Sequence, residues 1–215
     1  MIFMECFDIH THCIVSSQKK AIASCSIGIE PLSEEADYVS VGIHPWHLTE
    51  ENASRLLQLL ERELQDKRVL AIGEAGLDRL HGAPLDIQVS TFRNEIILAE
   101  NYHFPVIIHC VKAFGELLHL KKELRPQQPW IIHGFRGKKS MALELLRHGC
   151  FLSFGANFHK DTVRSVPVDR LFIETDESKE NIEDICRYIA EVKGVSPEEL
   201  ADAINKNVCK VFFKL

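Results

Sequence analysis

Eight short apolar or β-branched runs recur along the chain, and most of them end in a polar or charged residue. These runs read MECFDIH, AIASCSIG, DYVSVGIH, RVLAIGE, PVIIH, WIIH, CFLSF and RLFIET. Between the later runs lie segments whose apolar residues recur at helical spacing, namely 52–66, 86–101, 113–124 and 138–148. Apolar strands that alternate with helices predict a parallel sheet covered on both faces, and eight of them predict a TIM-type (β/α)₈ barrel.

Three connections between the predicted strands are too short for a full helix. They are the first (13–20), the second (29–36) and the seventh (157–168), so we expect a compact barrel with shortened crossovers at these places. Two closing helices are predicted over 180–192 and 197–213; the second begins at Ser196, with a proline and two acids in its first turn. No linker, repeat or low-complexity segment interrupts the sequence, so we expect a single domain over residues 1–215.

The composition is that of one globular domain, with 215 residues of which 46% are hydrophobic and 26% charged. This excludes a disordered or collagen-like chain. A chain of this length buries roughly 70% of its unfolded surface, so a metal site is expected to serve function rather than folding. The formal charge of -6 gives no overall basic field for nucleic acid, and attraction for a phosphate must therefore be local.

The seven cysteines form no C-x-x-C pair, which argues against a disulfide framework or a zinc ribbon and favours a reducing compartment. The first residues, MIFMECFDIH, reach an acid at once and lack a basic segment followed by a long apolar run. No stretch approaches the roughly 18 apolar residues of a membrane span. We therefore expect a cytoplasmic monomer that binds no membrane.

Residues that bind metals follow most of the predicted strands. In a parallel barrel the carboxyl ends of all strands meet at one rim, where active sites are built. A single histidine at a strand end is more often structural, but four histidines, a glutamate and an aspartate at one rim predict a metal centre. Imidazole together with carboxylate suits zinc, manganese or iron better than calcium. The candidate ligands are His10, His12, Glu74, His109, His133 and Asp176.

The number of these ligands favours two divalent ions, which we expect to be Zn, Mn or Mg. A single catalytic zinc uses about three protein ligands, and six are present. His10 and His12 lie two residues apart on one strand, so they face the same way and can share an ion. We assign these two and Asp176 to one ion, His109 and His133 to the other, and Glu74 as a bridge between them.

The sequence resembles the TatD family of metal-dependent deoxyribonucleases, which belongs to the amidohydrolase-like barrels. The matching stretches are FDIHTH, VGIHPW, AIGEAGLD, PVIIHC, WIIHGFRG, VPVDRLFIETD and SPEELADAINKNVCKVF. They follow the family's order from residue 7 to the carboxyl terminus. The resemblance implies a two-metal phosphodiesterase, usually an exonuclease or endonuclease on DNA, with the six ligands above.

Two departures from the family pattern concern the contacts to substrate. After Cys110 the family commonly has Arg-Asp, whereas this chain has Val111-Lys112, so an arginine that would clamp phosphate is missing. After Asp176 the family's Ala-Pro-Tyr-Leu and longer loop are replaced by Glu177-Ser178-Lys179. The ligands are kept while the loops are trimmed, so the departures concern the substrate rather than the metal chemistry.

Further polar residues near the predicted rim are candidates for substrate contact. Arg136 and Lys112 could neutralise a phosphate, whereas Lys138 and Lys139 are more typical of a solvated loop. His44 is a candidate substrate contact, and it could equally donate to a ligand or pack around Pro45. The remaining candidates are Trp46 as a wall of the pocket and Asp8 and Glu174 as carboxylates behind the ligands.

Three functions are consistent with this pattern. The first is hydrolysis of a phosphodiester, with DNA or a small phosphodiester as substrate and with Asp176 and Glu74 as catalytic residues. The second keeps the metals but cleaves a small amide, ester or lactone; many such barrels have a modified lysine where this chain has Glu74, while the acidic net charge favours this second function. The third is a metal-binding protein without turnover.

Overall fold

Eight parallel strands form one sheet in the computed structural model, which describes residues 5–13 and 20–215. Neighbours in the sheet follow the order of the chain from β1 to β8. The strands are β1 (Asp8–Thr11), β2 (Ala21–Ser26), β3 (Tyr38–Gly42), β4 (Val69–Asp78), β5 (Val106–Val111), β6 (Trp130–Ile132), β7 (Phe151–Phe154) and β8 (Leu171–Ile173).

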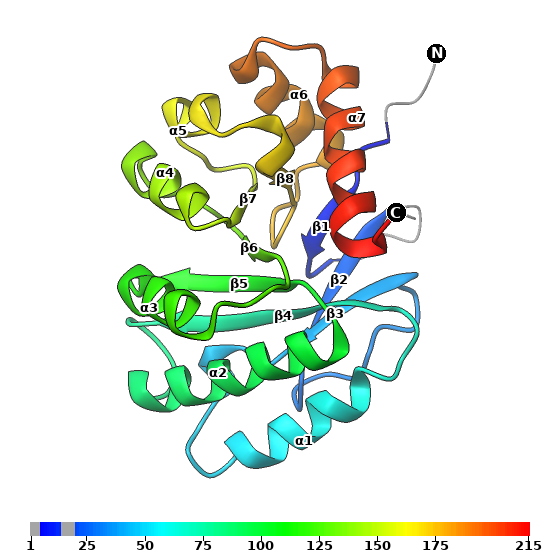
Figure 1. The fold of residues 1–215 in the computed structure, drawn as a ribbon. Helices are drawn as coiled ribbons and strands as arrows, with labels where there is room; N and C mark the ends of the chain where they lie inside the picture. Colours follow the sequence, from blue (N-terminus) through cyan, green and yellow to red (C-terminus); the bar gives the residue numbers. More distant parts are fainter. Residues whose placement is uncertain (1–4, 14–19) are drawn as a thin grey trace.

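Helices cover the outside of this sheet (Figure 1). They are α1 (Ala53–Glu63), α2 (Leu85–Tyr102), α3 (Phe114–Leu124), α4 (Lys139–Arg147), α5 (Lys160–Ser165), α6 (Ile182–Lys193) and α7 (Pro197–Val208), with the short turns η1 (Pro45–His47) and η2 (Val168–Arg170) and a π-helical end η3 (Cys209–Phe213). The strands and the inner helix faces share one buried core, whose largest fully buried side chains include Trp130, Phe92, Phe154 and Phe172.

The seam between β1 and β8 closes through a single bridge. Thr11 pairs with Asp176, whose carbonyl accepts the His12 amide at 3.1 Å and whose amide donates to the His10 carbonyl at 2.9 Å. The sheet is therefore a nearly closed barrel, which confirms the predicted (β/α)₈ architecture. The carboxyl terminus packs against the first strands, since the ring of Phe213 lies 6.1 Å from Phe7 and 5.2 Å from Tyr38.

The structure confirms that the second and seventh crossovers between strands are short. The second crossover, residues 27–37, contains no helix, and the seventh holds only the six residues of α5 and the turn η2, as expected. The first crossover lies largely at 14–19, outside the described residues. The last predicted helix, 197–213, is wrong in one respect, because it continues as a π-helix beyond Val208; its start is confirmed by the reciprocal hydrogen bonds of Ser196 and Glu199.

Strand β4 is longer than its apolar run predicts. The run ends at Glu74, but β4 continues to Asp78 and pairs with β5 as far as Val111. Gly76 makes this close pairing possible, because a Cβ built on it would overlap the carbonyl oxygen of His109. The extension places a further carboxylate, that of Asp78, at the rim of the barrel.

No helix in the described part of the chain is both long enough and apolar enough to cross a membrane.

Candidate metal centre

Glu74 lies at the centre of a cluster of imidazoles at the carboxyl ends of the strands. Its side chain extends from the interior of β4 and is only 4% exposed. Oε1 lies 2.7 Å from His109 Nδ1, 2.7 Å from His133 Nε2 and 3.1 Å from His44 Nε2. Oε2 lies 3.5 Å from His10 Nε2 and 3.4 Å from His12 Nε2. One buried carboxylate thus faces five histidines from four other positions in the barrel.

Asp176 completes the cluster from the opposite side of the seam. Its Oδ1 lies 3.6 Å from His10 Nε2 and 3.8 Å from His12 Nε2. The residue has a left-handed backbone with φ of 56°, which directs the chain back toward β1 after β8. Its side chain is 25% exposed, so this carboxylate reaches solvent while Glu74 does not. The structure therefore brings all six predicted ligands together.

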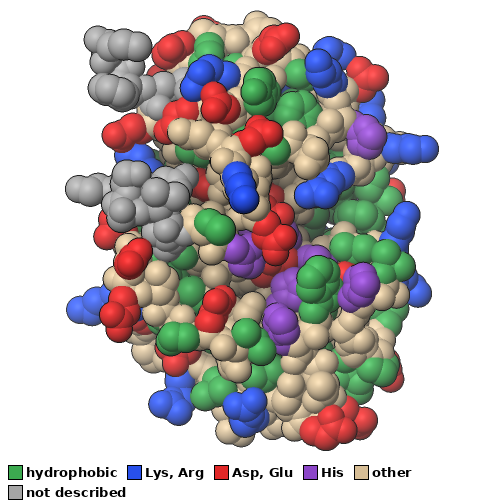
Figure 2. Space-filling model, turned by 180° about the vertical axis from the view of Figure 1, so that it is seen from behind, with side chains coloured by type: hydrophobic (Ala, Val, Ile, Leu, Met, Phe, Trp, Pro, Cys, Tyr) green, Lys and Arg blue, Asp and Glu red, His purple; other side chains and the backbone are tan. Residues whose placement is uncertain are grey.

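Imidazoles and acids gather at one place on the molecular surface. Figure 2 shows purple histidine side chains in the middle of one face, with red acidic side chains among and above them. Some blue lysine or arginine side chains stand just above this group, and others lie toward the edges of the same face. The cluster of the six predicted ligands and His44 is called the rim cluster below.

The donor set and its unpartnered atoms fit a metal. Both ring nitrogens of fully buried His10 lack a hydrogen-bond partner among the described residues, as does His133 Nδ1. Buried polar atoms without partners are costly, and a cation bound to one of the His10 nitrogens would remove part of that cost. Nitrogen and carboxylate donors together suit zinc and other divalent transition metals.

The electrostatics of the cluster also call for positive charge. Burial alone would raise the pKa of Glu74, but the charge of His133 and hydrogen bonds from neighbouring imidazoles hold it well below its usual range. Burial would lower the pKa of His133, whereas Glu74 and Glu174 hold it well above its usual value. Glu74 is therefore anionic and draws positive charge onto the imidazoles of His10 and His133, whose pKa values are both raised. A divalent cation supplies that charge without protonating them.

Three groups of side chains place their ligand atoms close enough to share one ion. They are His10, His133 and Asp176; His10, His12 and Glu74; and His44, Glu74 and His109. Glu74 and His10 each occur in two groups, as expected if two ions share ligands. The grouping differs from the predicted assignment in two residues, since His133 lies beside His10 and Asp176 while His44 lies beside His109.

A second layer of buried polar groups orients the ligands. Asp8 is fully buried and accepts hydrogen bonds from the amides of His10 and Thr175 and from the Thr175 hydroxyl, at 3.2, 3.1 and 2.6 Å. Burial, only partly offset by these bonds, raises the pKa of Asp8 to about 7. Glu174 accepts the amide of Gly134 and lies 3.5 Å from His133 Nδ1. Both acids thus stand behind ligands, as predicted.

Asp78 contributes to the centre but was not among the predicted site residues. Its Oδ2 lies 3.1 Å from His109 Nε2 and accepts the Trp46 indole N–H at 2.7 Å. Through these contacts it fixes the ring of His109, whose other nitrogen faces Glu74. The signal was present in the sequence, because Asp78 lies four residues after Glu74 and therefore on the same face of a continued strand.

Glu95 was also missed, because it comes from a helix rather than from a strand. It lies on the inner face of α2, is 1% exposed, and accepts the backbone amide of Ile43 at 2.8 Å. Ile43 directly precedes His44, so this bond anchors the loop that carries His44 into the cluster. A glutamate at an apolar position of the helical pattern, among Thr91, Phe92, Ile96 and Ala99, was the available signal.

The burial of Glu95 predicts a pH dependence of stability. Burial raises its pKa from 4.5 to about 8, so folding favours the protonated carboxyl. The resulting stabilisation is complete below pH 4.5 and is lost as the pH rises toward 8. In Glu95→Gln the neutral amide replaces the protonated acid. We expect the difference in Tm between variant and wild type, measured calorimetrically, to become more favourable to the variant from pH 6 to pH 9.

Exposed acids supply the control for this measurement. Glu191, on the outer side of α6, has no described ion pair, and Glu191→Gln should show the same pH profile as wild type. A Glu95→Gln profile parallel to that of wild type would contradict a proton held on Glu95.

The three predicted substrate-contact residues differ in their placement. His44 is buried within the cluster, 3.1 Å from Glu74, so it is placed to act on metal or ligands as well as on substrate. Arg136 is exposed beside Asp176 and lines a hollow of about 240 Å³ with Glu174, Asn157 and other residues. Lys112 is exposed after β5 and forms no hydrogen bond or ion pair in the described structure.

Lys138, Lys139 and Trp46, which the sequence also placed near the rim, lie in different surroundings. Lys138 and Lys139 border a second, shallower hollow with His159 and Lys160, farther along the rim. The ring of Trp46 is 51% exposed and lies 5.8 Å from His109, so it forms part of the wall of the centre.

Comparisons with known proteins agree with this architecture. The family model described as TatD related DNase matches residues 8–213. An uncharacterized metal-dependent hydrolase of Bacillus subtilis, YabD, is 34% identical, covering 83% of this chain and 79% of its own length. The human deoxyribonuclease TATDN3 is 31% identical, covering 69% of this chain and 61% of its own.

The solved structure of a TatD homologue from Escherichia coli, YjjV, superposes with a TM-score of 0.83 at 20% identity, covering 99% of each chain. A TatD-family hydrolase from Entamoeba histolytica superposes with a TM-score of 0.81 at 19% identity, covering 98% of this chain and 99% of its own. These likenesses show the fold. Together with the match over residues 8–213, they establish that this chain belongs to the TatD family of metal-dependent hydrolases.

Proposed function

We propose that this protein hydrolyses phosphodiester bonds of DNA with two divalent ions held in the rim cluster, releasing nucleotides from a strand end or cutting within the strand. The observation that carries the proposal is the position of Glu74, a buried carboxylate facing five imidazoles, in a cluster whose other carboxylate, that of Asp176, lines an open hollow. The relative described as a deoxyribonuclease supports DNA as the substrate class.

The two ions would be held by overlapping ligand sets. His10, His12 and Asp176 would hold one and His109 and His44 the other, with Glu74 and His133 available to complete either set. When bound, such ions lower the pKa of a water nucleophile and neutralise charge on the phosphate. Asp78, Asp8 and Glu174 keep the imidazoles oriented through the contacts described above.

In this proposal Asp176 accepts a proton from the attacking water. It is the part of the cluster that combines a carboxylate with access to solvent. Its pKa is lowered, because contacts with His10 and His133 outweigh the effect of burial, so it is ionised at neutral pH and able to act as a base. Arg136 faces the same hollow and would bind a non-bridging phosphate oxygen of the substrate.

A second substrate class is favoured by the charge around this hollow. Glu174, Asp176 and Glu177 line it with Arg136 as the one cation among its lining residues. This balance suits a small neutral amide, ester or lactone better than a long polyanion. The acidic net charge of the chain, -6, points the same way.

The deciding experiment offers both substrate classes to the same protein. Purified protein with Mg²⁺, Mn²⁺ or Zn²⁺ is incubated with labelled single-stranded DNA and with a panel of neutral esters, amides and lactones. Mass spectrometry of the products reports the bond cleaved and the polarity of cleavage along the strand.

Arg136→Gln should raise KM for the oligonucleotide about tenfold at unchanged kcat, because a charge-assisted hydrogen bond to substrate is lost.

A matched substitution separates this effect from a general loss of positive charge. Arg147 is exposed at the end of α4, outside the hollow, and Arg147→Gln should leave KM unchanged. Turnover of a neutral substrate that is insensitive to Arg136→Gln, with DNA left intact in every metal, would replace the phosphodiesterase proposal by the second class. Absence of all turnover from a metal-loaded protein would indicate a metal-binding role alone.

A further inference from the structure

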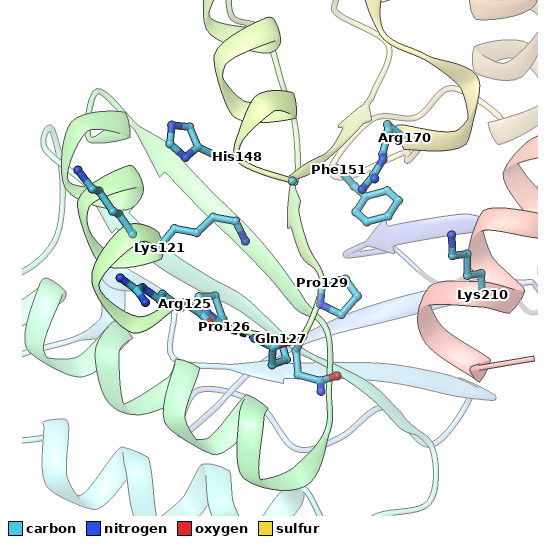
Figure 3. Close-up of a pocket in the computed structure, with 12 residues that line it drawn as sticks. Lys121, Arg125, Pro126, Gln127, Pro129, His148, Phe151, Arg170 and Lys210 are labelled. Atoms are coloured by element: carbon cyan, nitrogen blue, oxygen red, sulfur yellow. Dashed lines mark hydrogen bonds between the residues drawn. The ribbon is translucent and has the colours of Figure 1, made fainter.

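A third, more voluminous hollow lies at the opposite end of the barrel from the rim cluster. It has a volume of about 510 Å³ and lies where β7 and β8 begin rather than where they end (Figure 3). Arg170 directly precedes β8 and Asp176 follows it, and six residues of extended chain span about 20 Å. The hollow is therefore separate from the metal centre. Its lining residues are Lys121, Lys122, Arg125, Pro126, Gln127, Gln128, Pro129, His148, Gly149, Phe151, Arg170 and Lys210.

All titratable side chains in the lining are basic. It holds three lysines, two arginines and a histidine, and it holds no aspartate or glutamate. These cations come from α3, η2 and η3, segments far apart in the sequence that Figure 3 shows facing a common space. Five fixed positive charges around one hollow are unexpected in a chain whose net charge is -6.

No ion pair neutralises these cations within the described structure. Lys121 lies 4.4 Å above the ring of Trp130, and Arg170 lies 4.9 Å above the ring of Phe151, so aromatic faces hold both side chains in place. Glu100, the acid whose field reaches Lys121, already accepts the backbone amides of Gln127 and Gln128. Two of the five cations are thus held in position by aromatic rings, and none of the five forms an ion pair in the described structure.

The ammonium group of Lys121 is partly buried, which makes an anionic partner in the hollow favourable. Burial lowers the pKa of its ammonium group, because the charged form is partly removed from water and no carboxylate forms an ion pair with it in the described structure. An anion in the hollow would supply that missing partner. Lys121 and Arg170 lie on different walls, so an anion that satisfies both must extend across the space between them.

We propose that this hollow is a binding site for a small ligand that carries two or more phosphate groups. Its volume falls within the range of about 300–1,000 Å³ that is usual for small-molecule sites. Arginines and lysines on separate walls are suited to several phosphate groups at once. The ring of Phe151 is 7% exposed and covered by Arg170, so recognition rests on the phosphates rather than on stacking of a base.

The test measures binding directly, by isothermal titration calorimetry of the full chain with inorganic pyrophosphate and with ATP. An excess of EDTA removes divalent ions, so that phosphate cannot be recruited through metal at the rim cluster, and about 0.15 M salt screens non-specific attraction. We expect saturable binding of one ligand per chain. Equal affinity for both ligands identifies the phosphate groups as the recognised chemistry. ATP binding tighter than that of inorganic tripolyphosphate, which carries the same number of phosphates, identifies a nucleotide.

Two neighbouring lysines provide a matched pair of variants. Lys210 lines the hollow, whereas Lys206 lies one turn earlier, in α7, and does not; both are exposed. Lys210→Met should weaken binding about tenfold, and Lys206→Met should leave it unchanged, because only the first removes a charge-assisted contact. Lys121→Met, which keeps an apolar chain over Trp130, should weaken binding at least as much.

Three results would overturn the proposal. They are the absence of saturable binding, an equal loss of affinity in Lys210→Met and Lys206→Met, and binding of a single-stranded oligonucleotide without binding of either small ligand. The last result would make the hollow a nucleic-acid contact. The measurement needs no turnover, so its outcome is independent of the proposed hydrolase activity.

Discussion

Glu74→Gln is expected to empty the metal centre and to lower kcat/KM about a thousandfold or more. The substitution keeps the shape of the side chain but removes the negative charge that faces five imidazoles. It also directs an amide N–H₂ toward nitrogens that lie 2.7–3.5 Å away. Elemental analysis of the dialysed protein should show the loss of bound metal, and steady-state kinetics should show the loss of turnover.

Glu95→Gln is the matched control, since it makes the same change at another buried glutamate beside the same cluster. Burial raises the pKa of Glu95 to about 8, so its carboxyl is largely neutral at pH 7 and the amide replaces it with little change in charge. The control should retain metal and most of the activity. Full metal content in Glu74→Gln would contradict the central position assigned to this carboxylate.

Asp176→Asn is expected to lower kcat about a thousandfold while most of the bound metal is retained. Asparagine preserves one ligating oxygen and tolerates the left-handed backbone at φ of 56°, so the fold should persist. What is lost is the ability to accept a proton. The kinetic signature is a fall in kcat at nearly constant KM, measured beside the metal content of the same preparation.

Asp202, exposed on α7, is the matched position for this second variant, and Asp202→Asn should behave like wild type. The two active-site variants separate metal binding from proton transfer: the first is expected to lose both, the second chiefly the transfer. Activity of Asp176→Asn within tenfold of wild type would assign the proton to another acceptor.

The alternation of apolar runs with helical spacing was sufficient to predict the barrel. All eight runs contain strands, because a strand covered on both faces by helices must be apolar along its length. The ends of the runs then brought together His10, Glu74, His109 and Asp176, since parallel topology alone places the carboxyl ends of strands at one rim.

Asp78, Glu95 and the basic hollow could not be predicted from the ends of the apolar runs. Glycines at 73 and 76 interrupt the apolar pattern of β4, so the strand appeared to end at Glu74 and Asp78 was left out of the site. Glu95 enters from a helix, and strand ends carry no information about it. The basic hollow also went unnoticed, because its cations come from separate loops and helix ends that periodicity does not place relative to one another.

The bridge between Thr11 and Asp176 connects the predicted metal centre to the closure of the barrel. Every other pair of neighbouring strands is joined by a ladder, whereas the first and last are joined by this one bridge, with His10 and His12 on either side of Thr11. An ion bound by both His10 and Asp176 would link β1 to the end of β8, so the free energy of metal binding would add to the stability of the fold. Metal binding would then stabilise the closed barrel, and loss of metal would lower its free energy of unfolding.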